Sequence, residues 1–226
     1  VNNAGSSDPF PRDGSGSRVS LFDDVVIDGI GIAFEQNAAG EGYRFIAGVD
    51  EVGRGCLAGP VVAAACILDL AKPLPAGLDD SKKLTEKRRE AIADELKRSC
   101  VAYAIGRVEA DEIDRINILE ATKRAMLLAI GGLDPAADYL LIDALHLKQS
   151  PLPQKAIIKG DSISASIAAA SVIAKTHRDG LMKAYDSEFP QYGFAGHKGY
   201  GAASHLAALR EHGPCRLHRR SFRGVL

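Results

Sequence analysis

Four acidic residues stand where apolar segments of the chain begin or end. Asp50 and Glu51 close one apolar run, Asp143 closes a second, and Asp161 opens a stretch rich in alanine and serine. Side chains at the carboxyl ends of strands in an open α/β sheet converge on one crevice, where each close pair of carboxylates repels by about 4 kcal/mol at an effective dielectric constant near 20. Divalent cations relieve such repulsion, and two ions about 4 Å apart can clamp a phosphodiester. The pattern therefore predicts metal-assisted phosphodiester hydrolysis.

Each of these acids also has a purely structural interpretation. Asp161, placed before a helical pattern, could be the N-cap of that helix. Asp143 could mark no more than the exit from a strand. Asp50 and Glu51 are adjacent, so on a regular strand their side chains point to opposite faces. They can share one site only if the strand ends or bends at the glycines that follow.

The glycines after Glu51 resemble two nucleotide-binding motifs without satisfying either. Gly48 and Gly53 have the spacing of a phosphate-binding loop, but Arg54-Gly55 stands where that loop needs Lys-Ser or Lys-Thr. A dinucleotide site would need a helix after Gly59, whereas the pattern predicts a strand there, and two acids occupy the place where a pyrophosphate would approach. The glycines instead leave bare backbone amides and carbonyls available to a close ligand.

The elements that must position these residues follow from periodicity and from helix and strand punctuation. Strands are expected at residues 45–50, 61–68, 100–108, 139–142 and 156–158. Helices are expected at residues 33–39, 85–99 with Thr85 as N-cap, 117–130, 163–177 and 202–211. The helix at 163–177 is so rich in alanine and serine that it can pack very closely on its neighbour. Together these elements predict an α/β domain with one mixed sheet.

Composition and charge narrow the class of protein. No apolar run approaches the roughly 20 residues of a membrane span. The four cysteines are scattered with no metal-site or disulfide spacing, which favours a reducing, cytoplasmic compartment and buried thiols, Cys56 included. The net charge is −1, yet residues 151–226 carry eleven basic and five acidic side chains, a net charge of +6. This basic third, with Arg219 and Arg220 near its end, is a candidate surface for phosphates.

Several motifs, in order and at characteristic spacing, resemble the ribonuclease HII family, the single-chain form of type 2 ribonuclease H. The resemblance extends over residues 33–222 and is carried by the segments 47–64, 80–84, 159–161, 164–171, 174–175, 178–179, 197–201 and 218–222. It sets a domain boundary: residues 1–32 are expected to be a largely disordered N-terminal extension. Residues 33–226 are expected to be the catalytic domain, with a helical segment from about residue 186.

The resemblance implies both a fold and an activity. The fold would be ribonuclease-H-like, a five-stranded mixed sheet flanked by helices with a small C-terminal helical part. The activity would be that of an endoribonuclease that hydrolyses the RNA strand of RNA–DNA hybrids and cuts 5′ of ribonucleotides embedded in duplex DNA. Two-metal-ion catalysis with manganese or magnesium would leave 5′-phosphate and 3′-hydroxyl ends. The resemblance also implies a monomer whose partners are RNA–DNA hybrids and ribonucleotide-containing duplex DNA, with no membrane involved.

Residue by residue, the resemblance assigns the roles at the site. The catalytic, metal-binding carboxylates would be Asp50, Glu51, Asp143 and Asp161. The ribose 2′-hydroxyl would be read by Gly53, Arg54 and Gly55, mainly through backbone. Tyr200 would pack against the sugar on the DNA side of an RNA–DNA junction. Supports for phosphate or for the active site would be Lys82, Lys83, Lys198 and Arg178.

Some residues keep open alternatives. Tyr200, between two glycines, could be a loop aromatic that covers the core. His177, His197 and His218 lie in matching segments, but each could be a structural hydrogen-bonding group, and none is assigned as a ligand. Ala202 departs from the family, which often has threonine there, and this removes a helix cap and no catalytic group.

Two other function classes compete with the ribonuclease assignment. A metal-dependent nuclease of the same fold, such as a junction resolvase, would act on DNA alone. It would need no reader of a 2′-hydroxyl, so Gly53-Arg54-Gly55 together with Tyr200 argues against it. A non-catalytic hybrid-binding module would have no use for the carboxylates, and all four are present.

Overall fold

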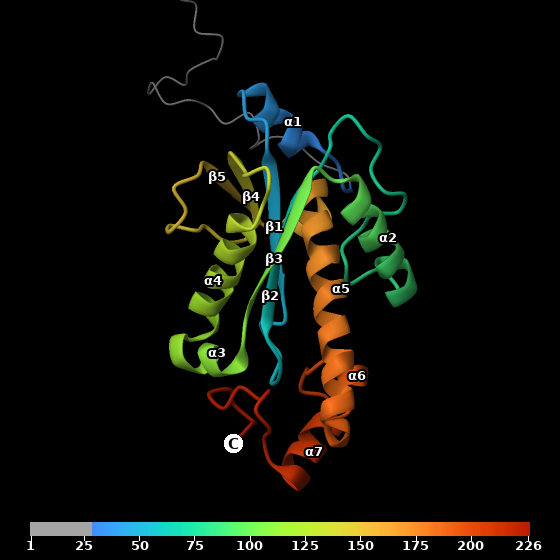
Figure 1. Ribbon diagram of the computed structural model, residues 1–226, viewed down its shortest axis with the longest axis vertical. Coiled ribbons are helices and arrows are strands. Elements are labelled where there is room, and N and C mark those ends of the chain that lie inside the picture. The colour runs from blue at the N-terminus through green and yellow to red at the C-terminus, as the bar shows by residue number, and fades with distance from the viewer. Residues whose placement is uncertain (1–28) are drawn as a thin grey trace, which may run out of the picture.

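A five-stranded mixed sheet with the order β3-β2-β1-β4-β5 runs through the centre of the protein (Figure 1). The computed structural model describes residues 29–226. β1 pairs antiparallel with β2 and β2 antiparallel with β3, whereas β1 pairs parallel with β4 and β4 parallel with β5. The strands are β1 (Ile46–Val52), β2 (Val61–Ile67), β3 (Ala102–Val108), β4 (Tyr139–Asp143) and β5 (Gln154–Ile157).

Helices cover both faces of this sheet. Figure 1 shows the sheet nearly edge-on, with α3 and α4 on one side and α2 and α5 on the other. The helices are α1 (Ala33–Gly40), α2 (Glu86–Ser99), α3 (Ala110–Ile116), α4 (Ile118–Gly131), α5 (Ala165–Glu188), α6 (Phe194–His197) and α7 (Ala203–His212). Two short 3₁₀ helices, η1 (Gly160–Ser162) and η2 (Pro190–Tyr192), flank α5. The predicted five-stranded mixed sheet flanked by helices is confirmed.

The strand β2 shows how the sequence divides into two cores. Every residue of Val61–Ile67 is buried, because the sheet is covered on both faces. Alternate side chains point to opposite faces, so Val61 and Ala63 join the core beneath α4. Val62 and Ala64 join the core beneath α2 and α5.

Glycines allow helices to approach the sheet closely. A methyl group built on Gly48 of β1 would lie 2.0 Å from the backbone carbon of Ser166 in α5. A methyl group on Gly106 of β3 would lie 2.1 Å from the carbonyl oxygen of Ala125 in α4. The close packing predicted from the small residues of α5 is therefore present.

The elements differ from the sequence prediction mainly at their ends. β1 continues through Val52 instead of ending at Asp50, because β2 pairs with it along its whole length. The predicted helix at 163–177 begins at Ala165 and runs on to Glu188, and Met182 and Tyr185 in its added part pack with Tyr192 of η2 and Phe194 of α6. The helix α3 was not predicted, because its seven residues are too few to show a clear period. Thr85 is the N-cap of α2, as expected, and accepts a hydrogen bond from the amide of Arg88.

The C-terminal part closes one end of the sheet. The chain after α7 returns beneath the loop that joins β1 to β2 (Figure 1), where Ala58 and His218 form an isolated antiparallel bridge. The amide of Leu57 donates to the carbonyl of Gly199 over 2.8 Å, which ties a third segment to the same loop. Three distant parts of the sequence therefore meet beside the end of β1.

Most of the predicted N-terminal extension, residues 1–28, lies outside the described residues. The rest of it is held in place. Gly31 donates from its amide to Ile163 and accepts from the amide of Ala165, and Ile30 and Ile32 pack on the core beside α5. None of the helices between residues 29 and 226 has the length and apolar character that crossing a bilayer requires.

Candidate active site

Asp50 and Glu51 both lie within β1. The neighbouring strand β4 is shorter than β1, and its early end lets both side chains reach one site. The parallel register pairs Val49 with Ile142, and β4 ends at the next residue, Asp143. β1 therefore extends past β4 and leaves that flank open. The strand continues through both acids and ends at Val52, directly before Gly53, as the sequence analysis required if they were to share one site. The charge of Asp143, at the end of β4, raises the pKa of both Asp50 and Glu51, which places the three carboxylates near one another.

Burial and mutual repulsion disfavour the charged forms of these acids. Asp50 is 4% exposed, and its burial, followed by the charge of Glu51, raises its pKa well above the usual value. A hydrogen bond from the Ser171 side chain partly offsets this rise. Burial also raises the pKa of Glu51, against the opposing charge of Arg54, and burial raises the pKa of Asp143. Carboxylates whose charged form is disfavoured by burial and repulsion are typical of sites that bind a cation or move a proton.

Asp161 joins the group from η1. Asp143 accepts a hydrogen bond from the amide of Gly160 over 2.7 Å, which draws the two segments together. Asp161 is buried, and its Oδ2 lies 3.0 Å from the Nζ of Lys82. The N-cap of α5 is Ser164, whose hydroxyl accepts from the amide of Ile167. The alternative interpretation of Asp161 as the cap is therefore wrong.

The donor set suits a hard divalent cation. All four acids offer oxygen ligands, and the Oε2 atom of Glu51 is buried without a hydrogen-bond partner among the described residues. Side chains from residues 29–226 form no group of three acids, histidines or cysteines that could hold a metal ion as they stand. Two of the acids have cationic partners in this structure: Lys82 donates to Asp161, and Arg54 lies 3.2 Å from Glu51.

The turn Gly53-Arg54-Gly55 follows directly on the acids. Gly53 has φ +90°, and a methyl group there would lie 2.2 Å from the Nε of Arg178, so only glycine fits. A methyl group on Gly55 would meet nothing within 4 Å, so that face of the turn is open. The amides of Arg54 and Gly55 donate no hydrogen bond within residues 29–226, and they remain available to a ligand.

The four predicted supporting cations separate into different environments. Lys82 reaches Asp161, whereas Lys83 lies 3.1 Å from Asp79, which is not one of the four acids of the site. The ammonium group of Lys198, the residue after α6, donates to the carbonyl of Ala195 in that helix. Arg178 is fully buried, so it can support the surrounding loops but cannot present its charge at the surface.

Tyr200 lies on the loop after α6. Its side chain is 43% exposed, which is too much for a residue that seals the core. The ammonium of Lys175 lies 6.0 Å from its ring centroid, and burial of the hydroxyl, then the charge of Cys56, raises its pKa. The bond from Leu57 to Gly199 holds this loop beside the Gly53-Arg54-Gly55 turn.

The sequence matches the ribonuclease HII family over residues 47–225. The chain belongs to the ribonuclease HII family. It is 60% identical to ribonuclease HII of Chlamydia caviae over 190 residues, which cover 84% of this chain and 89% of that protein. It is 55% identical to ribonuclease HII of Syntrophotalea carbinolica over 192 residues, 85% of this chain and 91% of that protein.

A solved structure agrees with this assignment. The ribonuclease H2 from Pyrococcus horikoshii OT3 superposes with a TM-score of 0.67 at 25% sequence identity, over 80% of this chain and 95% of that one. As a member of the ribonuclease HII family, the protein is an enzyme, a hydrolase of the ribonuclease H class.

Several residues of this ribonuclease HII site were not predicted. The Oγ of Ser171 lies 2.9 Å from the Oγ of Ser81, which links Asp50 to the segment that carries Lys82. The charge of Asp80 reaches Asp143 and Lys82. Ser81 and Asp80 stand in a segment that the resemblance had marked, so motif membership was the available signal.

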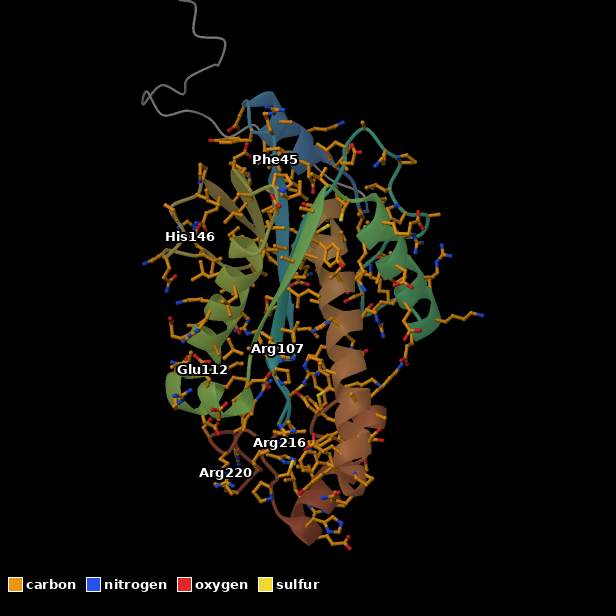
Figure 2. All side chains as sticks on the ribbon, viewed as in Figure 1. Phe45, Arg107, Glu112, His146, Arg216 and Arg220 are labelled. Carbon is orange, nitrogen blue, oxygen red and sulfur yellow. The ribbon has the colours of Figure 1, made fainter. Side chains whose placement is uncertain are left out.

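Burial corrects two sequence interpretations in the C-terminal third. Arg219 is fully buried, so it is not part of the predicted basic surface, whereas Arg220 is exposed (Figure 2). Cys56 and Cys66 are buried as expected, but Cys100 and Cys215 are only partly buried, and all four thiols are free. His205 and His218 are buried and lie 3.0 Å apart between ring nitrogens, which supports a structural role for His218.

Proposed function

We propose that this protein is an endonuclease that hydrolyses the RNA strand of RNA–DNA hybrids and cuts 5′ of ribonucleotides embedded in duplex DNA, leaving 5′-phosphate and 3′-hydroxyl ends. The observation that carries the proposal is the fixed link between the acids and the turn behind them. Arg54 Nη1 contacts Glu51 Oε1 at 3.2 Å, and only Val52 separates Glu51 from Gly53. A group that touches the ribose and groups that act on its phosphate therefore share one rigid segment.

Asp50, Glu51, Asp143 and Asp161 are proposed to hold divalent metal ions, manganese or magnesium. When bound, such ions polarise the scissile phosphate and supply an activated water nucleophile. Three features support this assignment: oxygen-only ligands, the raised pKa values that burial and repulsion cause, and the unpartnered Oε2 of Glu51. The carboxylates would orient the water and the phosphate, and Lys82 would keep Asp161 aligned.

The Gly53-Arg54-Gly55 turn is proposed to bind the 2′-hydroxyl of the target ribonucleotide. A 2′-hydroxyl both donates and accepts, and the free amides of Arg54 and Gly55 supply donors at the open face of the turn. A deoxyribonucleotide would leave such a group unpaired, at a cost of about 1–3 kcal/mol. Tyr200, half-exposed on the adjoining loop, would pack on the sugar of the next nucleotide.

The rival functions account for fewer of these features. A nuclease specific for DNA would have no use for an open turn with free amides beside the carboxylates. A non-catalytic binding module would keep four acids beside a phosphate-binding site, where they repel the substrate. The ribonuclease function uses both features.

The decisive experiment compares two substrates that differ in one atom. A duplex with a single ribonucleotide should be cut, with magnesium or manganese present, at least about a hundredfold faster than the same duplex with a 2′-deoxy nucleotide there, since lost contacts and a misplaced phosphate add up. Asp143→Asn should reduce cutting by orders of magnitude while substrate binding remains. Equal cutting of the two duplexes would contradict the proposed function.

A further inference from the structure

Two arginines are buried beneath the Gly53-Arg54-Gly55 turn, and the proposed function does not require the charge of either. Arg178 on α5 and Arg219 near the C-terminus both have fully buried side chains. Burial lowers the pKa of Arg219 to about 10, which reflects how unfavourable the position is for a charge. Isolated buried charges are costly unless hydrogen bonds replace the lost water, so these two residues need an explanation.

Within the described residues, every hydrogen bond that the two guanidinium groups donate is accepted by a backbone carbonyl. Arg219 donates to Gly53 over 2.7 Å, to Arg54 over 2.8 Å and, from two nitrogens, to Gly59 over 2.8 and 3.0 Å. Arg178 donates to the carbonyls of Ala58 and Pro60 over 3.0 Å and of Lys198 over 2.8 Å. The planar fork of a guanidinium can reach several carbonyls at once, which an ammonium cannot.

These contacts fix the orientation of the turn. The carbonyls of Gly53 and Arg54 point inward to Arg219, and the amides of Arg54 and Gly55 are left without partners in the described part of the chain. Rotation of either peptide plane outward would break a bond to a buried charge. Arg219 is itself anchored, because its amide donates to Leu57 over 2.9 Å and its guanidinium lies 5.1 Å from the ring of Phe222.

We propose that Arg219 is a positioning residue for ribose selectivity: its guanidinium holds the Gly53 and Arg54 carbonyls inward so that the turn presents its amides to the 2′-hydroxyl. The inference rests on the proposed function. Arg178 has a complementary role. Its guanidinium donates to the loop carbonyls and also to the carbonyl of Lys198, so it joins the loop to the segment before Tyr200. The last residues of the chain thereby set the geometry of a turn that lies some 165 residues earlier in the sequence.

The matched control is Arg220, the next residue in the chain. It has the same charge and the same side chain, but it is exposed (Figure 2). Its amide, not its guanidinium, donates to Asp114. If either arginine contacted a phosphate, replacing it with alanine would make the slope of log binding constant against log salt concentration shallower by about 0.9. A positioning role for Arg219 predicts no change of slope.

The experiment measures kcat and KM of Arg219→Ala, Arg219→Lys and Arg220→Ala on the single-ribonucleotide duplex and on its 2′-deoxy counterpart. Thermal unfolding and the salt dependence of binding are recorded alongside. We expect Arg219→Ala to lower the ratio of ribonucleotide to deoxyribonucleotide cutting at least tenfold, mainly through kcat. Arg219→Lys should recover part of the ratio, and Arg220→Ala should behave as the unaltered protein. Loss of folded protein alone would lower both rates and leave the ratio unchanged.

The outcomes are separable. A folded Arg219→Ala protein with the original ratio overturns the inference, and so does a salt slope that becomes shallower by about one phosphate contact. If Arg219→Ala does not fold, Arg219→Lys decides in the same way, because it keeps the charge and loses the fork. An unaltered protein that cuts both duplexes equally overturns the proposed function, and this result is read before any variant is made.

Discussion

The buried charge of Asp50 lowers the stability of the folded protein. Its carboxylate is buried, and both burial and the neighbouring Glu51 disfavour its charge. A carboxyl group whose pKa is raised on folding contributes instability above its unfolded pKa, and neutral pH lies in that range. The charge therefore serves the chemistry and opposes stability.

Asp50→Asn should consequently stabilise the metal-free protein while abolishing its activity. Asparagine keeps the shape and can still accept the hydrogen bond from the amide of Glu51. In the presence of a chelator, we expect thermal unfolding of Asp50→Asn to occur several degrees higher, since 1 kcal/mol corresponds to about 2–4 °C in a chain of this size. Added magnesium or manganese should then stabilise the unaltered protein more than the variant.

Asp69→Asn is the control for this comparison. Asp69 is paired with Lys72, whose hydrogen bond lowers the pKa of the carboxyl group, so neutralising it removes no repulsion. It should give no increase in unfolding temperature. A lower unfolding temperature for Asp50→Asn in chelator would show that the Asp50 charge stabilises the metal-free fold.

Lys82 and Lys83 are adjacent residues with different expected contributions. Lys82 lies 3.0 Å from Asp161, and Lys83 lies 3.1 Å from Asp79. Both side chains are largely exposed, so neither pair should contribute more than about 1 kcal/mol to stability. We expect Lys82→Ala to lower kcat/KM on the single-ribonucleotide duplex about tenfold, a loss within the range for a bond to a charged group. Lys83→Ala should change it less than about twofold, and equal losses would reduce both lysines to general surface charge.

At the scale of an element, the turn after β1 offers a test that separates fold from function. Gly53 has φ +90° and would clash with Arg178, so Gly53→Ala should destabilise the protein by a few kcal/mol. Gly55 has no such constraint, because a methyl group there meets nothing within 4 Å. Gly55→Ala should leave the unfolding temperature nearly unchanged.

The same Gly55→Ala substitution should nevertheless impair cutting. The added methyl group occupies the open face of the turn, where the ribose is proposed to bind, and a small displacement of a reacting group can lower the rate about a hundredfold. Steady-state kinetics on the single-ribonucleotide duplex, together with thermal unfolding, check both halves of the prediction. Full activity in a stably folded Gly55→Ala protein would place the ribose elsewhere.

At the scale of the whole molecule, a chain of neutral histidines holds the C-terminal part to the rest. His218 accepts from the amide of Cys215 at Nδ1, and its Nε2 lies 3.0 Å from the Nε2 of His205. His205 Nδ1 lies 2.8 Å from the carbonyl of Tyr200, so it must carry the proton there, and His218 must donate from Nε2. An additional proton on His218 Nδ1 would face the Cys215 amide, which is itself a donor.

This arrangement predicts a loss of stability in acid. Burial, and then the neighbouring His205, lower the pKa of His218 to about 4, while an unfolded histidine titrates near 6.5. The unfolded state therefore binds more protons between these values, and stability falls as the pH decreases from about 6.5 towards 4. The loss from this residue would reach about 3 kcal/mol. Denaturant unfolding at a series of pH values measures it, and a His218→Gln protein should show a flatter dependence.

A replacement at His212 provides the reference. His212 lies at the end of α7 with a partly exposed ring, so His212→Gln should keep the acid dependence of the unaltered protein. If His218→Gln and the unaltered protein lose stability in parallel, the histidine chain does not control the acid response.

Much of the fold was readable in the sequence because it rests on local patterns. The five strands were predicted from short apolar runs. The Ala- and Ser-rich stripe of α5 predicted close packing on its neighbour, which is observed where α5 meets Gly48 of β1. The ends of elements were less predictable, since β1 extends to Val52 only because β2 pairs with it. The motifs were sufficient to indicate the family.

Long-range contacts decided the rest. Asp50 and Glu51 reach one site because β4 stops at Asp143, and no property of residues 50 and 51 predicts where another strand ends. Lys82 and Lys83 are equivalent in sequence, and only the position of η1 gives one of them a carboxylate of the site. Arg219 and Arg220 have the same charge, yet one is buried and the other exposed. Burial of an arginine depends on carbonyls that distant segments bring to it, and those positions exist only once the chain has folded.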